Sequence, residues 1–280
     1  MFNAIRTAIV TLYLFNKADM KTIVGPCIIF ALALAKNRSW TSSLLAVFWL
    51  WIVLLQVTLT NQTVGNSPAE DAINKPNRPI PSGRISHKTA RALRWIMLPI
   101  DLIISVKMGA FPAATGISIL TALYNEGGLD EHWFTKNGCC AFFYGAFEYA
   151  NTPTLSINQL AGIICSGLIA WTTIHAQDFR DDEGDRLRNR KTFTLLYPEL
   201  SRLTIPVALI GWSLALFYFS QVRIVAKAVT LMLAIWVGFR FYALRDTQND
   251  KWSYDMYDVW LVAAHYCLSD LQVEQTIVVY

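Results

Sequence analysis

Long apolar runs, separated by short polar connections, dominate the pattern of hydrophobic and polar positions along the chain. A helix needs about 20 mostly apolar residues to cross a bilayer, and nine runs come close to that length. They lie at residues 19–36, 40–61, 87–107, 109–126, 134–150, 157–177, 200–219, 222–243 and 254–274. The pattern therefore predicts an all-α polytopic membrane protein with nine transmembrane helices, in a single domain over residues 1–280.

The composition supports a membrane protein and excludes one class of partner. Hydrophobic residues make up 54% of the chain and charged residues only 16%, whereas soluble domains carry about 25% charged residues. The net charge of +4 is small, and no basic stripe follows the sequence, so we expect no nucleic-acid partner. Nothing in the sequence indicates an obligate protein partner, and the lipid bilayer is the expected surrounding.

Two connections, residues 62–86 and 178–199, stand out by length and charge. They follow the second and sixth predicted helices, so four helices separate them and both emerge on the same side of the bilayer. Most Lys and Arg residues lie on that side. Those expected on the other side are Lys36, Arg38, Lys107 and Arg223. The positive-inside rule therefore places the N-terminus and both connections in the cytosol.

Four aspartates open the second connection, directly after an apolar run: Asp178, Asp181, Asp182 and Asp185. If the helix continues, their spacing of i, i+3, i+4 and i+7 places all four on one face. Like charges at these spacings destabilise a helix, and a divalent cation would compensate them. Mg²⁺ prefers hard oxygen ligands such as carboxylates, and it is usually coordinated by substrate phosphates as well.

Basic residues follow these aspartates closely, and they leave two interpretations open. They are Arg180, Arg186, Arg188, Arg190 and Lys191. They could contact phosphate oxygens or pair with the acids. The alternative is a solvated loop beside the membrane that obeys the positive-inside rule, although that rule does not explain four aspartates on one face.

The first connection holds a second cluster of acidic and basic residues. Its members are Asn61, Glu70, Asp71, Lys75 and Arg78, in a frame of Pro76, Pro79, Pro81 and Gly83. Because proline fixes φ and cannot continue a helix, we expect a rigid non-helical loop here. Two such clusters, at equivalent positions of two four-helix halves, could clamp one diphosphate through bridging metal ions.

The paired motifs resemble those of the UbiA superfamily of intramembrane prenyltransferases. The first reads Asp71, a short spacer and Arg78-Pro79-Ile80-Pro81, and the second reads D-x-x-D-x-x-x-D at residues 178–185. Further matches point to a fungal branch that includes membrane-bound terpene cyclases. These are Gln177-Asp178-Phe179-Arg180-Asp181, Glu70-Asp71 followed by Asn74-Lys75-Pro76, Tyr124-Asn125-Glu126 and Lys136-Asn137.

The resemblance implies a helical bundle around a central cavity with a cytosolic cap, in the endoplasmic reticulum membrane, that binds Mg²⁺ and a prenyl diphosphate at its cytosolic end. The implied metal ligands are Asn61, Glu70, Asp71, Asp178, Asp181 and Asp185, of which Asp71, Asp178 and Asp181 are the expected catalytic residues. The implied diphosphate contacts are Lys75, Arg78, Arg180, Arg186 and Lys191. One departure is that Asn61 lies ten residues before Asp71, with Ser67 at the usual midway acid, which changes the metal geometry or weakens binding.

Two reactions fit these motifs. Both begin when Mg²⁺, Arg and Lys neutralise the leaving diphosphate, and aromatic faces then stabilise the carbocation. Weak candidates for the cavity lining are Tyr124, Asn125, Tyr144 and Trp171. A cyclase folds the cation onto its own double bonds, whereas a prenyltransferase passes it to an aromatic or quinone-like acceptor. No acceptor-activating base stands out in the apolar helices: Asp101 and Glu148 could serve, but a structural role near a helix end fits both better. The branch resemblance favours the cyclase.

A transporter is the alternative from another class. Transporters place ionisable residues near the bilayer midplane at broken helices. The charges in this sequence gather instead at the cytosolic ends of predicted helices, which argues against transport.

Overall fold

The computed structural model describes residues 2–34, 39–152 and 155–272, and these residues form helices without any strand. The longer helices are α1 (Phe2–Asn16), α2 (Gly25–Leu34), α3 (Trp40–Thr63), α5 (His87–Lys107), α6 (Phe111–Asn125), α7 (Trp133–Asn151), α8 (Ile157–Thr173), α11 (Pro198–Phe219), α12 (Ile224–Ala243) and α13 (Thr247–Leu268). Shorter segments are the π-helical η1 (Met20–Val24), α4 (Ser67–Asn74), the 3₁₀ segment η2 (Ile174–Arg180), α9 (Asp182–Leu187) and α10 (Phe193–Leu196).

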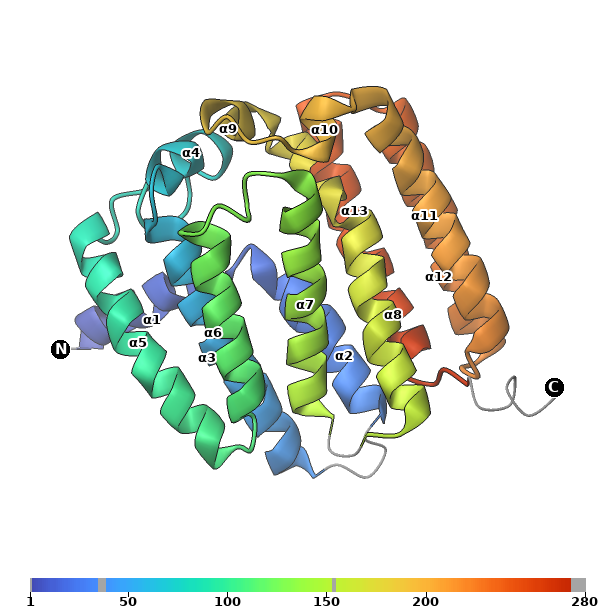
Figure 1. Ribbon diagram of the computed structural model, residues 1–280, viewed down its shortest axis with the longest axis horizontal. Coiled ribbons are helices and arrows are strands. Elements are labelled where there is room, and N and C mark those ends of the chain that lie inside the picture. The colour runs from blue at the N-terminus through green and yellow to red at the C-terminus, as the bar shows by residue number, and fades with distance from the viewer. Residues whose placement is uncertain (1, 35–38, 153–154, 273–280) are drawn as a thin grey trace.

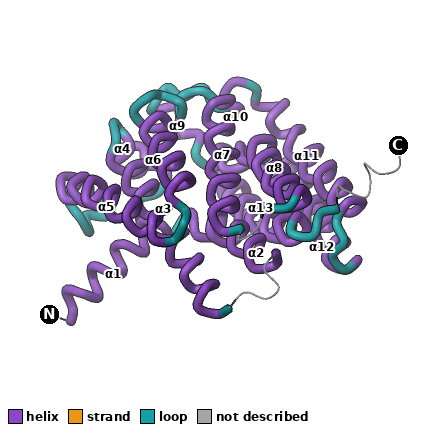
Figure 2. Tube along the Cα trace, turned by 60° about the horizontal axis from the view of Figure 1, so that its bottom comes forward, coloured by secondary structure: helices purple, strands orange, loops and turns teal. Residues whose placement is uncertain are grey.

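The long helices stand side by side in one bundle (Figure 1), with α7 packed on α8, α3 on α5, and α12 between α11 and α13. Large aromatic side chains fill its interior, among them Trp49, Tyr144, Phe147 and Trp260. Helix α1 extends from the edge of the bundle (Figure 2) and is tied to α3 where the Asn16 amide donates to the Trp51 carbonyl, 2.9 Å away. The short helices α4, α9 and α10 lie together at one end of the bundle (Figure 1).

Each of the nine predicted apolar runs falls on a helix, although residues 35, 36, 273 and 274 at the ends of two runs lie outside the described residues. Four helices are long and apolar enough to cross a membrane by length and composition: Trp40–Thr63, Ile157–Arg180, Pro198–Phe219 and Ile224–Ala243. Many large apolar side chains on the outside of the bundle are exposed, such as Val207 and Val225. A surface of this kind is stable against lipid chains rather than water.

The predicted non-helical loop after α3 is partly wrong, because α4 forms there and carries Glu70 and Asp71. Pro68 does not prevent the helix, since it lies in the first turn, where a backbone N–H has no intrahelical acceptor. Residues 64–66 and 75–86 stay non-helical, and the second of these segments contains the other three prolines.

The predicted single face of four aspartates is also wrong at one position. The chain leaves α8 through the tighter η2 and breaks at Asp181 before α9 begins. Residues are eclipsed at i and i+3 in a 3₁₀ turn, so the α-helical spacing does not hold. Asp178, Asp181 and Asp185 are buried, whereas Asp182 turns aside and accepts from the Thr194 hydroxyl at 2.8 Å.

Candidate active site

The two predicted clusters meet where α4 packs against α9. The Asn74 side chain bridges them, because its amide nitrogen donates to the Asp181 carbonyl at 2.9 Å and its oxygen accepts from the Gly184 N–H at 3.2 Å. A Cβ at Gly184 would overlap the Asn74 amide and lie 2.8 Å from Glu70 Cγ. Glycine at 184 therefore permits the close approach of the two motifs.

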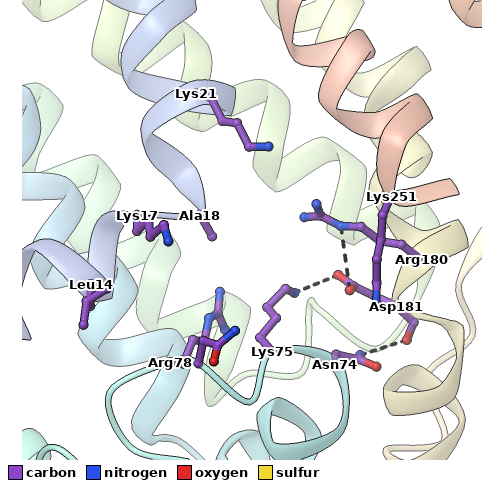
Figure 3. Close-up of a pocket in the computed structure, with 11 residues that line it drawn as sticks. Leu14, Lys17, Ala18, Lys21, Asn74, Lys75, Arg78, Arg180, Asp181 and Lys251 are labelled. Carbon is purple, nitrogen blue, oxygen red and sulfur yellow. Dashed lines mark hydrogen bonds and ion pairs between the residues drawn. The ribbon is translucent and has the colours of Figure 1, made fainter. Parts of the chain in front are cut away.

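Cations of the first motif pair with acids of both motifs. Arg78 Nη1 donates to Asp71 Oδ1 within its own motif at 2.7 Å. Lys75 Nζ reaches across to Asp181 Oδ2, also at 2.7 Å, and Figure 3 shows this contact beside the one from Arg180 to the same carboxylate. Asp181 thus lies between a cation from each motif.

Arg190 joins three acids from three parts of the chain. Its guanidinium lies 2.9 Å from Glu70 Oε1, 2.9 Å from Asp185 Oδ1 and 2.6 Å from Asp130 Oδ2. Arg188 adds contacts to Glu70 and Asp130, both at 3.1 Å. These arginines pair with acids, which is one of the two interpretations that the sequence left open for them.

Lys136, near the start of α7, extends the cluster to a third region. Its ammonium lies 2.6 Å from Asp178 Oδ1 and 3.9 Å from Asp185 Oδ2, and both Lys136 and Asp178 are buried. Removing one partner of such a buried pair leaves an uncompensated charge, which strongly destabilises a protein. The sequence contained a signal for Lys136, since a lone lysine in an apolar segment usually faces a polar interior.

A pocket of about 110 Å³ opens among these groups. Its lining includes the predicted residues Asn61, Glu70, Asp71, Lys75, Arg78, Tyr124, Asn125, Arg180, Asp181 and Asp185. The Asn125 amide donates to Asn61 Oδ1 at 2.8 Å, and the Tyr124 ring packs edge-on against Phe143. Lys136, Gln177 and Arg190 line the same pocket but were not among the predicted site residues.

A second pocket of about 290 Å³ adjoins the first and shares Lys75, Arg78, Arg180 and Asp181 with it. Figure 3 shows its lining, to which α1 and its following turn, η1 and α13 add three lysines. These lysines, which the sequence did not single out, are Lys17, Lys21 and Lys251. Cations thus outnumber the single carboxylate in this lining, so the pocket attracts anions.

Five predicted residues line neither pocket. One of them, Asp178, is buried beside the smaller pocket and pairs with its lining residue Lys136. Arg186 and Lys191 are exposed. Tyr144 is fully buried deeper in the bundle, where its hydroxyl donates to the Thr22 carbonyl. Trp171 is half-buried and packs edge-on against Phe134.

The two motifs hold their carboxylates in different electrostatic surroundings. Burial alone would raise the pKa of Asp181, but Lys75 and Arg180 outweigh it and lower the pKa below its usual value. At Asp71, burial dominates over Arg78 and Lys75, so its pKa is raised. Asp181 is therefore the more firmly ionised of the two acids.

The acidic residues have the chemistry that Mg²⁺ requires. Asp71 Oδ2, Asp178 Oδ2 and Asp185 Oδ2 are buried without a hydrogen-bond partner among the described residues. Such free carboxylate oxygens are hard ligands of the kind that Mg²⁺ prefers. Within the described ranges, no three acidic side chains surround one ion position, because Lys75, Arg78, Lys136 and Arg190 pair with them.

An all-helical bundle with an apolar surface, and with acids and cations gathered at the helix ends, defines a membrane-embedded class of protein that binds an anionic group. The chain belongs to the UbiA prenyltransferase family, whose model matches residues 23–262. The resemblance that the motifs predicted is confirmed, and the protein is an integral membrane protein with a helical UbiA fold.

Two fungal relatives and one solved structure illustrate the likeness. The chain is 29% identical over 263 residues to fumagillin beta-trans-bergamotene synthase of Aspergillus fumigatus, covering 91% of this chain and 90% of that one. It is 34% identical over 212 residues to a diterpene cyclase of Hericium erinaceus, covering 68% and 65%. A UbiA homolog from Archaeoglobus fulgidus bound to DMAPP and Mg²⁺ superposes with a TM-score of 0.63 at 13% identity, covering 93% and 99%.

Proposed function

We propose that this protein is an Mg²⁺-dependent terpene cyclase that ionises farnesyl or geranylgeranyl diphosphate and cyclises the carbocation. The observation that carries the proposal is the joining of both acidic motifs across one pocket, through the contacts of Lys75 and Asn74 with Asp181. The two fungal relatives named as a terpene synthase and a cyclase support the same reaction class.

The residues of the pocket have distinct roles in this reaction. Asn61, Glu70, Asp71, Asp178, Asp181 and Asp185 would hold Mg²⁺, which supplies Lewis acidity and neutralises charge on the leaving diphosphate. Lys75, Arg78 and Arg180 line both pockets and would bind phosphate oxygens. Arg186 and Lys191 remain proposed contacts at the outer edge of the site, with no contact to either pocket among the described residues.

The membrane arrangement that we propose follows from the same pocket. The nine helical segments that carry the predicted apolar runs would surround a central cavity, with α4, α9 and α10 as its cap on the cytosolic side, in one domain of the endoplasmic reticulum membrane. The prenyl chain would then extend from the charged end into the bundle interior. Aromatic faces there, including Trp49 and Phe147 with ring centroids 6.1 Å apart, stabilise a carbocation.

A prenyltransferase that attaches the prenyl group to an aromatic or quinone-like acceptor is the second candidate. It is favoured by a different relative, a polyprenyl transferase of Hericium erinaceus that is 29% identical over 199 residues. Both candidates need the same ionisation chemistry, so the charged pocket does not distinguish them.

The deciding experiment incubates membranes that contain the protein with each diphosphate and Mg²⁺, without any acceptor. We expect diphosphate release together with a cyclic hydrocarbon or alcohol in the organic extract. Membranes with the Asp181→Asn variant are the control for background enzymes. Turnover that appears only when an aromatic co-substrate is added would replace the cyclase with the transferase.

A further inference from the structure

Three polar side chains from three helices meet in the apolar interior, away from the charged pocket. Glu148 of α7, Ser166 of α8 and His265 of α13 are each 0% exposed. The Ser166 hydroxyl lies 2.8 Å from Glu148 Oε1 and 2.9 Å from His265 Nε2, and Nε2 lies 3.2 Å from the same Glu148 oxygen. We call these three residues the interior cluster.

The contacts of the interior cluster call for one proton more than a neutral histidine, a serine and a carboxylate carry. His265 Nδ1 lies 2.7 Å from the Leu261 carbonyl, which can only accept, so Nδ1 carries a hydrogen. The Ser166 hydroxyl has one hydrogen but two close acceptors, Glu148 Oε1 and His265 Nε2. A further proton on Nε2 lets all these contacts form at once and leaves Glu148 as a carboxylate. The cluster then consists of a carboxylate and a protonated imidazole joined through serine.

One oxygen of the interior cluster can still accept a hydrogen bond or a proton. Glu148 Oε2 is buried and has no hydrogen-bond partner among the described residues. Buried polar atoms in membrane helices usually contribute hydrogen bonds between helices, and an unpaired one costs free energy. Glu148 Oε2 is therefore the oxygen of the interior cluster that is open to accept a proton.

The interior cluster lies below the charged pocket along the same helix. Lys136, which contacts Asp178, and Glu148 are twelve residues apart on α7, or about 18 Å at the rise of an α-helix. Tyr144 lies between them, with its ring 5.5 Å from the His265 ring and its hydroxyl on the Thr22 carbonyl. The cluster thus lies at the depth where a prenyl chain held by its diphosphate would place its far carbons.

We propose that Glu148 accepts the proton that ends the cyclisation, with Ser166 and His265 as positioning residues that hold its other oxygen. This inference rests on the proposed function. A C–H bond beside the cationic carbon breaks, and its electron pair forms the new C=C bond. The proton bonds to Glu148 Oε2, which needs no oxidant or further reactant, and it returns to water between turnovers.

The test compares product profiles from farnesyl and geranylgeranyl diphosphate for the wild type, Glu148→Gln and Ser166→Ala. Glu148→Gln keeps the shape of the side chain but removes the base. We expect diphosphate release within about fivefold of the wild type, while the main olefin falls at least tenfold in favour of alcohols or isomeric olefins. Ser166→Ala, the milder change, should give a smaller shift in the same direction.

Ser213→Ala is the matched structural control, because it removes another buried interhelical hydrogen bond, donated by Trp260 Nε1 at 2.9 Å. It should leave the product profile unchanged. Three outcomes would refute the role of Glu148 without refuting the proposed function. They are an unchanged product profile in folded Glu148→Gln, an equal shift of the profile in Ser213→Ala, and a wild-type product that contains no olefin. A wild type that releases no diphosphate without an acceptor overturns the proposed function itself.

Discussion

The charged pocket between α4 and α9 and the interior cluster of Glu148, Ser166 and His265 both bury carboxylates, but they handle charge differently. In and beside the pocket, Asp71, Asp178, Asp181 and Asp185 each contact a lysine or an arginine. In the cluster, the Glu148 carboxylate has hydrogen-bond or ion-pair contacts with only a serine and a histidine among the described residues. Permanent cations favour the ionised form of a carboxylate, whereas a histidine can itself hold or release a proton.

The largest expected effect tests the pocket side of this comparison. Asp71→Asn, Asp178→Asn and Asp181→Asn should each reduce diphosphate release by at least about 100-fold, because each removes a charge proposed to hold the metal. Release from farnesyl diphosphate with Mg²⁺ is the measurement. Asp182→Asn is the matched control, since that side chain bonds Thr194 instead, and it should stay near wild-type activity. Full activity of any of the three variants would refute its assignment.

A smaller expected effect is that Asp71 and Asp181 become protonated at different pH. The raised pKa of Asp71 means that acidification protonates this acid first, so its favourable contribution to stability is full at low pH and is lost as pH rises through its folded pKa. Asp181, with a lowered pKa, contributes stability at neutral pH that is lost only as pH falls through its folded pKa.

Arg78→Gln checks this order, because Arg78 lowers the pKa of Asp71. The acid limb of the kcat/KM profile should move to higher pH in this variant. Arg84→Gln alters an exposed arginine on the same loop and should leave the limb where it is. An acid limb that does not move in Arg78→Gln would show that Asp71 does not govern it.

The smallest expected effect concerns the exposed cations. Arg186→Ala and Lys191→Ala should change kcat/KM by only about twofold, because exposed charges are screened by salt. Lys75→Ala, which removes the cation between the two motifs, should reduce it roughly 100-fold. Equal losses in Arg186→Ala and Lys75→Ala would show that the outer residues contribute as much to diphosphate binding as Lys75 does.

Much of the fold could be predicted because a membrane helix is marked by one continuous apolar run in the sequence. Nine apolar runs of suitable length mark nine helical segments whatever packs beside them. The short helix α4 could not be predicted in this way, since eight residues with a proline in the first turn show no apolar periodicity. The π-helical segment η1 and the 3₁₀ segment η2 could not be predicted either, because their hydrogen bonding depends on what the adjoining helices pack against.

The sequence did not predict which of the neighbouring arginines in and after α9 would line the pocket. Helix α9 ends at Leu187, and Asn189 adopts a positive φ of 55°, a conformation that asparagine tolerates better than most residues. The chain therefore turns after α9, which directs Arg190 into the pocket and leaves Arg186 exposed. Sequence spacing alone could not distinguish these two side chains.

By itself, the sequence determined the helical membrane architecture, the two acidic motifs and their place at one end of the helical bundle. Each of these depends on residues close together in the chain. Tertiary structure decided which cation meets which acid, brought Lys136 to Asp178, and assembled Glu148, Ser166 and His265 from three helices. The contact of Lys136 with Asp178 and those among Glu148, Ser166 and His265 join side chains that are 18 to 117 positions apart, so they form only when packing brings their helices together.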